Sequence, residues 1–151
     1  MSVTRRAVLS ALPAGALSAL LPELMHASFG QTPQESLPSA VFAFDKLEVH
    51  HSGAAEMRSI LKGRLATGEA VEVHETTLPA GAAPHPPHRH EHSEMWLVRE
   101  GTLEINIAGK TQSLGAGSAA FVRSNELHGV HNASEQRVTY FVVAVGPGAA
   151  G

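Results

Sequence analysis

Apolar and polar residues alternate in short runs between residues 41 and 145, and turn residues interrupt the runs about every eight to twelve positions. A period of two places alternate side chains on opposite faces of a strand. No run in this region has a convincing helical period of 3.6 residues. The pattern therefore predicts an all-β sandwich or barrel. The expected strands cover residues 41–49, 57–65, 70–78, 94–101, 102–114 as two halves of a hairpin, 118–122 and 137–145.

The hairpin within residues 102–114 is the clearest local prediction. Its two alternating halves flank Ala108-Gly109-Lys110, a short turn sequence that contains glycine. Residues 57–65 have a mixed pattern and are the least certain strand. Residues 31–40 are polar with two prolines and are interpreted as a linker, so the barrel is assigned to residues 41–146. The glycine-rich residues 147–151 are expected to be a disordered tail.

Residues 1–30 are interpreted as an export signal. Arg5 and Arg6 precede an apolar run from Ala7 to about Leu21, which is too short and too broken for a membrane span. Residues 4–9 resemble the twin-arginine signal, although Ala7-Val8 departs from its usual pattern; a general secretory signal is the alternative. We expect cleavage after Ala27 or Gly30, a periplasmic or secreted protein, and no stable membrane span after cleavage.

Composition narrows the chemistry of the chain. It has 151 residues, a net charge of −3 and no basic stripe, so we expect one domain and no nucleic-acid partner. It contains no cysteine, which excludes disulfides, iron–sulfur clusters and thiol nucleophiles. Any metal ion must therefore be held by nitrogen and oxygen atoms.

Such ligands are concentrated in the stretch HPPHRHEHSE, residues 85–94, which holds four histidines and two glutamates. In an extended chain His88 and His90 point to the same side. Glu94 has the same parity, although a turn over residues 91–93 would make that parity unreliable. His128, in the second histidine-rich stretch NELHGVHN, could complete the set. Three imidazoles and one carboxylate suit Mn(II), Fe(II), Ni(II), Zn(II) or Cu(II).

These residues fall into two spaced motifs. The first consists of Gly81, His88-Arg89-His90, Glu94 and Gly101, and the second of Gly117, Arg123, Asn125, His128 and Asn132. With these motifs, residues 70–145 strongly resemble the cupin superfamily. The departures are a spacer one residue longer after Gly81, Arg123 where proline is usual, and Asn125 where glycine is usual. Asparagine tolerates positive φ, so Asn125 is a reasonable replacement.

The resemblance implies a double-stranded β-helix, or jelly-roll, barrel. It also implies that one divalent transition metal is bound by His88, His90, Glu94 and His128, with His88 and His90 on one strand and Glu94 on the next. A homodimer is implied as well. Twin-arginine export carries folded proteins, so the metal would bind in the cytoplasm before export. Copper and zinc bind most sites more tightly than other divalent metals do, so binding in the cytoplasm favours Mn or Fe, with Ni, Zn and Cu as alternatives.

Cupins include dioxygenases, decarboxylases, isomerases, lyases, sugar binders and metal-free proteins, so the resemblance names no reaction. Our first hypothesis is a metal-dependent enzyme, an oxygenase or an isomerase/lyase, acting on a small oxygenated molecule. The alternatives are a non-catalytic periplasmic cupin that binds a metal or small ligand, and a metal-free structural cupin.

Other polar and aromatic residues are assigned less directly. His85 and His92 are interpreted as flanking residues, and His131 as a surface residue because it lies three positions after His128. Trp96 is expected to fill the core or to line a substrate pocket. His50, His51 and His74 are expected at the surface. Glu104 and Tyr140 are the candidates for a general base inside the barrel. The candidates for binding a polar substrate are Arg99, Arg123 and Tyr140.

Overall fold

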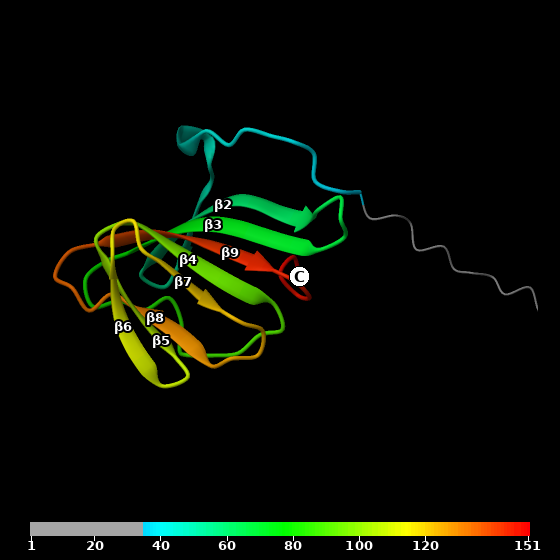
Figure 1. The fold of residues 1–151 in the computed structure, drawn as a ribbon. Helices are drawn as coiled ribbons and strands as arrows, with labels where there is room; N and C mark the ends of the chain where they lie inside the picture. The colour runs from blue at the N-terminus through cyan, green and yellow to red at the C-terminus, as the bar shows by residue number, and fades with distance from the viewer. Residues whose placement is uncertain (1–34) are drawn as a thin grey trace, which may run out of the picture. The chain divides into compact units, whose positions relative to one another are not determined.

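The computed structural model describes residues 35–151 as two antiparallel β-sheets that face each other (Figure 1). The predicted signal at residues 1–30 lies outside the described residues. The larger sheet has the strand order β1-β2-β3-β9-β4-β7, and the smaller has the order β6-β5-β8. The strands are β1 Val49–Ser52, β2 Ala55–Arg64, β3 Ala70–Leu78, β4 Ser93–Glu100, β5 Thr102–Ile107, β6 Lys110–Gly115, β7 Ala119–Val122, β8 His128–His131 and β9 Val138–Val145.

Apolar side chains fill the space between the two sheets. β5 contributes Leu103 and Ile105, both at most 1% exposed, and their neighbours Glu104 and Asn106 point to the opposite face. The large sheet contributes Trp96, Tyr140 and Val142, among others, to the same cluster. Burying one such side chain contributes about 1.5–3 kcal/mol. The result is the predicted all-β jelly-roll barrel.

Most of the predicted strands are confirmed. β3, β4, β7 and β9 fall within one or two residues of the predicted ranges, and residues 102–114 form the β5–β6 hairpin. Its turn residues Ala108 and Gly109 have φ values of 51° and 83°. Positive φ at both positions is what a two-residue type I′ turn requires. Asn106 supports the turn, because its Oδ1 accepts a hydrogen bond from the Gly109 N–H at 3.1 Å.

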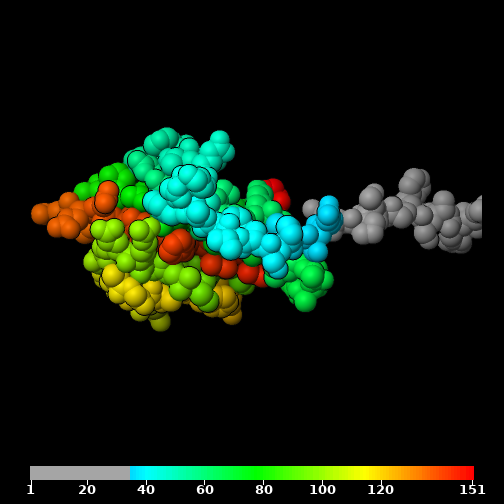
Figure 2. Space-filling view, turned by 90° about the horizontal axis from the view of Figure 1, so that it is seen from above, coloured from blue at the N-terminus to red at the C-terminus, as the bar shows by residue number. Residues whose placement is uncertain are grey.

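The strand predicted over residues 41–49 is wrong. Only Val49 belongs to a strand, and Phe44–Lys46 is a turn of 3-10 helix. β1 pairs with β2 through a tight turn at Gly53 (φ 59°), and its ladder begins only at Val49. Residues 41–46 lie exposed on the surface instead (Figure 2), where the Phe44 ring packs against the guanidinium groups of Arg58 and Arg99. Strand β8 was missed, because its four residues, HGVH, show too little alternation.

Special backbone positions explain two residues of the sequence motifs. Gly101 has φ 79°, and a Cβ there would lie 2.6 Å from the Arg137 carbonyl oxygen, so no other residue fits. Asn125 has φ 62°, as expected for a residue that replaces glycine. Near the C-terminus, where a disordered tail was expected, residues 147–150 form a turn. Ala149 is 2% exposed there and packs with Ala70 and Ala144. Between residues 35 and 151, no helix is long and apolar enough to cross a membrane.

Candidate metal centre

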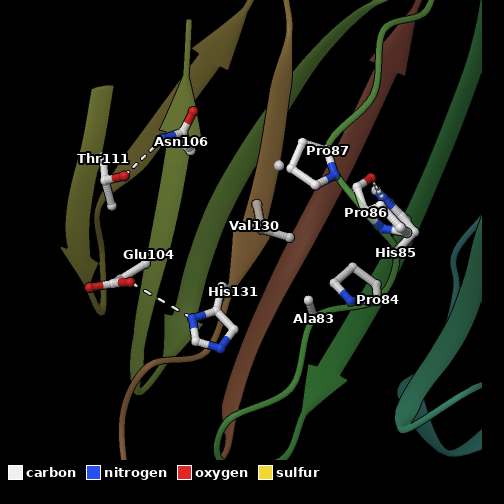
Figure 3. A pocket seen from close by; sticks show the side chains of 11 residues that line it. Ala83, Pro84, His85, Pro86, Pro87, Glu104, Asn106, Thr111, Val130 and His131 are labelled. Atoms are coloured by element: carbon white, nitrogen blue, oxygen red, sulfur yellow. Dashed lines mark hydrogen bonds and ion pairs between the residues drawn. The ribbon is translucent and has the colours of Figure 1, made fainter. Parts of the chain in front are cut away.

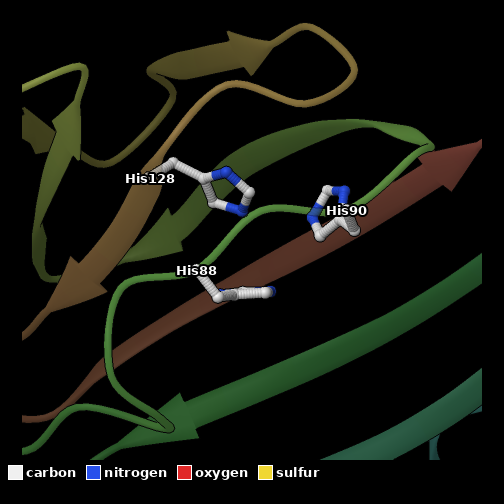
Figure 4. Close-up of side chains that lie close together, drawn as sticks. All are labelled: His88, His90 and His128. Atoms are coloured by element: carbon white, nitrogen blue, oxygen red, sulfur yellow. The ribbon is translucent and has the colours of Figure 1, made fainter.

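Three histidines converge at one end of the barrel interior (Figure 4). His128 is the first residue of β8, whereas His88 and His90 lie on the irregular segment between β3 and β4. The expectation that His88 and His90 share a regular strand is therefore wrong. Pro84, Pro86 and Pro87 precede them and lack the N–H donors that a strand ladder needs. The segment is nevertheless fixed to β8 by two backbone hydrogen bonds between His88 and His128, of 2.9 and 3.1 Å.

The three imidazole rings lie close enough to share one ion. Their ring centroids are 5.1 Å apart for His88 and His90, 4.8 Å for His88 and His128, and 4.6 Å for His90 and His128. Glu94, near the start of β4, places its Oε2 3.0 Å from His90 Nε2 and 3.2 Å from His128 Nε2. His88, His90 and His128 thus form one close group of possible ligand atoms, and Glu94 adjoins two of them. His90 and Glu94 also form a second such group with His92, so the role of the four predicted residues as ligands stays a prediction.

Backbone carbonyls orient two of these rings. His90 Nδ1 lies 2.8 Å from the His92 carbonyl oxygen, and His128 Nδ1 lies 2.8 Å from that of Glu126. Because a carbonyl only accepts, each Nδ1 carries the proton, and in the neutral ring Nε2 presents a lone pair. Both Nε2 atoms face the Glu94 carboxylate, an arrangement that suits a cation bound between them or, in a doubly protonated ring, a hydrogen bond donated to the carboxylate.

Unpartnered ring nitrogens support the same conclusion. His128 Nε2 and His88 Nδ1 are buried without a hydrogen-bond partner. Leaving a buried polar atom unsatisfied costs about 1–3 kcal/mol. Burial, followed by the neighbouring histidines, lowers the pKa of His88, so this ring is neutral at neutral pH. Metal ions bind neutral imidazole, and the donor set of nitrogen and carboxylate oxygen fits a divalent transition metal.

Comparison with known proteins agrees with this fold and these motifs. The family described as "Cupin domain" matches residues 74–144. Residues 74–144 of this chain form a cupin domain. No curated protein sequence is detectably similar to it.

Solved cupin structures resemble the barrel at low sequence identity. An RmlC-like cupin from Shewanella frigidimarina has 22% identity and a TM-score of 0.60, over 71% of this chain and 91% of that one. KdgF from Halomonas sp. has 16% identity and a TM-score of 0.61, over 71% and 94%. A predicted oxalate decarboxylase from Thermotoga maritima has 21% identity and a TM-score of 0.59, over 70% and 98%. At these identities the likeness establishes the fold alone.

Beside the histidines, the cupin barrel contains a cavity of about 120 Å³. Trp96 is 3% exposed and belongs to the core cluster, yet it also lines the cavity, with its ring centroid 5.4 Å from that of His128. Trp96 therefore fills the core and also lines the cavity, and its contact with a substrate stays a prediction. Tyr140 lines the cavity too, and burial raises the pKa of its phenol, so it stays protonated.

His74 is the residue that the sequence prediction missed. It was assigned to the surface, but its side chain is 16% exposed and lines the cavity. The assignment rested on the absence of a partner for His74 in the sequence, and the apolar Val71 and Val73, which have the opposite parity, gave no reason to place it inside. The signal that could have indicated the inner face is Leu78, which is fully buried and lies four residues after His74, on the same face of the strand.

The other histidines near the centre occupy its border or the outside. The ring of His92 stacks on that of His90 at 3.6 Å, and the ring of His85 meets that of His88 at 4.3 Å. His85 also lines the cavity, so its position goes beyond that of a flanking residue. His50 and His51 are exposed on β1, as expected.

Glu104, a candidate base, points away from the cavity. It lies on the outer face of the small sheet beside His131, with 3.8 Å between Glu104 Oε2 and His131 Nδ1 (Figure 3). Both line an open hollow of about 650 Å³ against residues 83–87. Glu104 therefore cannot act inside the barrel, whereas His131 is exposed as predicted. Arg99 and Arg123, the candidate substrate-binding arginines, pair with Glu75 at 2.6 Å and Glu126 at 3.4 Å.

Asn132, the last residue of the second motif, has a structural role. Its side chain is fully buried, and its Nδ2 lies 3.1, 3.0 and 2.7 Å from the carbonyl oxygens of Leu78, Pro79 and Gln136. Its Oδ1 accepts hydrogen bonds from Ser134. The side chain therefore ties the chain after β8 to the end of β3, close to where the segment bearing His88 and His90 begins.

Proposed function

We propose that this cupin binds one divalent transition-metal ion per chain through His88, His90, Glu94 and His128, and that it is a metal-dependent enzyme for a small oxygenated molecule. The observation that carries the proposal is the set of oriented ring nitrogens around Glu94. His128 Nε2 is buried without a hydrogen-bond partner, and the Nε2 atoms of His90 and His128 both lie within 3.2 Å of one carboxylate oxygen.

When bound, a divalent metal would act as a Lewis acid that polarises a substrate oxygen and orients it. The chain itself supplies the walls of the cavity. Trp96 and Val142 offer apolar surface, while Thr76 and Tyr140 offer hydroxyl groups. The volume of about 120 Å³ is well below the roughly 300 Å³ at which drug-sized sites begin. A substrate of few atoms, bound through oxygen, fits this space.

The reaction classes we favour are those of an oxygenase or an isomerase/lyase. One structural neighbour is described as a predicted oxalate decarboxylase, and that description supports chemistry on small oxygenated molecules in this kind of barrel. The second candidate is a non-catalytic cupin that holds the metal or a small ligand, because the cavity is enclosed enough to retain a ligand without turnover.

Elemental analysis after loading with Mn, Fe, Ni, Cu and Zn tests the first step, with one equivalent per chain expected. Calorimetric titration with diketones, hydroxy acids and phenols then tests whether binding needs the metal. Turnover or oxygen uptake separates the enzyme from the binding protein. Less than a tenth of an equivalent of every metal would contradict the proposal, and binding without turnover would favour the second candidate.

We also propose that the protein is exported to the periplasm or secreted and acquires Mn or Fe before export. The support is the Arg5-Arg6 pair with its apolar run. Intact mass of natively expressed protein should show the loss of about thirty residues. Replacing Arg5 and Arg6 with lysines should block export by the twin-arginine route but have little effect on the general route. A retained N-terminus would contradict both.

A further inference from the structure

Strand β3 carries a second polar pair, Glu72 and His74, outside the proposed ligand set. His74 lines the cavity together with Glu94, His128 and Tyr140. Strand β9 separates it from the nearest proposed ligand, because His74 pairs with Val142 while Glu94 pairs with Ala144. His74 thus lines the same cavity as the proposed ligands, but its strand does not pair directly with the strand of Glu94.

The two ring nitrogens of His74 have different surroundings. Nδ1 is buried, makes no hydrogen bond, and lies 3.4 Å from Glu72 Oε1. The other carboxylate oxygen of Glu72 lies 3.8 Å from Lys62 Nζ on β2, which keeps the carboxylate in place. A carboxylate beside Nδ1 favours the tautomer with the proton on Nδ1. Nε2 then carries the lone pair and is the nitrogen available to a ligand in the cavity.

We propose that His74 is an acid–base residue for the substrate bound in this cavity and that Glu72 positions it. The inference rests on the proposed function and narrows it to the isomerase/lyase class. Nε2 accepts a proton from a carbon next to a carbonyl group, and the electron pair of the broken C–H bond forms the enolate. In a hydroxyketone, the protonated ring then returns the proton to the former carbonyl carbon, while the substrate's own hydroxyl proton moves to the former carbonyl oxygen and a new C=O bond forms at the first carbon. In an elimination, the ring gives the proton to a hydroxyl group on the next carbon, which departs as water as the enolate forms a C=C bond.

The charges around His74 suit a base. Burial lowers the pKa of His74, and the carboxylates of Glu72 and Glu94 oppose this effect, whereas His85 acts in the same direction as burial. Lys62 reaches Glu72 from β2, and Tyr140 on β9 remains a neutral phenol. The ring is therefore neutral at neutral pH, so it can accept a proton, and the nearby carboxylates stabilise the cation that forms.

Exchange of carbon-bound hydrogen provides the test without knowledge of the substrate. Metal-loaded protein is incubated with hydroxyacetone or pentane-2,4-dione in D₂O, and loss of the C–H signals is followed by proton NMR. His74→Gln should slow protein-catalysed exchange about 100-fold, with unchanged metal content and probe affinity. His50→Gln, at an exposed position on β1, is the matched control. In Glu72→Gln the pH midpoint of exchange should fall by about one unit, because a carboxylate that favours the protonated ring is lost.

The outcomes separate this inference from the function on which it rests. Failure of both probes to bind the metal-loaded protein would overturn the proposed function. Binding without exchange in the wild type, or equal exchange in wild type and His74→Gln, would overturn the role of His74 and leave the ligand site intact. An unchanged pH midpoint in Glu72→Gln would overturn the positioning role of Glu72.

Discussion

The two faces of strand β8 each present a histidine near a glutamate. His128 points inward, is 1% exposed, and lies 3.2 Å from Glu94, whereas His131 points outward and lies 3.8 Å from Glu104. The side chain of His131 remains 47% exposed. The two histidines are three residues apart on one strand, yet only the inner one lies among further imidazoles.

The difference teaches that residue type alone does not make a metal site. The outer pair is solvated, and an exposed ion pair of this kind contributes about 0–1 kcal/mol. The inner histidine is desolvated, its Nδ1 is held by a backbone carbonyl, and its Nε2 is without a hydrogen-bond partner. Burial and orientation, rather than the number of histidines, distinguish the candidate centre from the hollow outside.

The largest predicted effect is therefore on metal binding. His90→Ala and His128→Ala each remove an imidazole from the cluster, and we expect metal affinity to fall at least about 100-fold, equivalent to about 2.8 kcal/mol. His131→Ala and Glu104→Gln, from the outer face, should bind metal as the wild type does. Competition with a chromophoric chelator measures the affinities. Loss of metal in His131→Ala would show that the ligand assignment is wrong.

Two asparagines extend the comparison to stability. Asn132 is fully buried and contacts three carbonyl oxygens, whereas Asn106 is on the outside and contacts Thr111 at 2.8 Å. Asn132→Ala should lower the free energy of unfolding by about 3 kcal/mol, because buried carbonyls lose their donor. Asn106→Ala should lower it by about 1 kcal/mol, because only the exposed hydrogen bonds with Thr111 and the Gly109 N–H are lost. Urea unfolding of metal-free protein measures both, and equal losses would refute the structural role given to Asn132.

The barrel and the four converging residues could be predicted because their signals are local. Strand alternation and the spacing of His88, His90, Glu94 and His128 are visible in the chain itself. The path of the chain through these residues was less predictable. Three prolines replaced the expected strand with an irregular segment, and that segment is fixed by its pairing with His128, forty residues away in sequence.

His74 and Glu104 were misassigned for a different physical reason. Alternation divides a strand into two faces but does not say which face is inward when both carry polar residues. On β3, apolar Val71 and Val73 have the opposite parity to the residues that line the cavity, which are His74 and Thr76. A cavity lined by polar residues departs from the usual apolar interior, so strand parity fails as a guide beside the candidate centre.

A smaller predicted effect concerns how stability depends on pH, and it distinguishes His74 in the cavity from an exposed histidine such as His50. Burial lowers the pKa of His74 below its ordinary value of 6.5. As the pH falls below 6.5, the unfolded chain binds this proton before the folded chain does, so stability is lost toward lower pH. In metal-free protein, His74→Gln should reduce that slope by up to about 1.4 kcal/mol per pH unit. Urea unfolding between pH 7 and 5 measures it, with His50→Gln as the control; an unchanged slope would show that His74 is not buried as described.

The smallest signal comes from Trp96, the single tryptophan of the chain. Its ring centroid lies 5.4 Å from that of His128, so an open-shell ion held by His128 should quench its fluorescence. Zn(II), which has a filled d shell and no redox chemistry, should bind with far less quenching and serves as the control metal. Titration with Mn(II) or Cu(II) should therefore decrease the emission in wild type and in His131→Ala, but not in His128→Ala. Equal quenching in His128→Ala would place the ion elsewhere, and equal quenching by zinc would mean that the signal reports a conformational change instead of proximity to the ion.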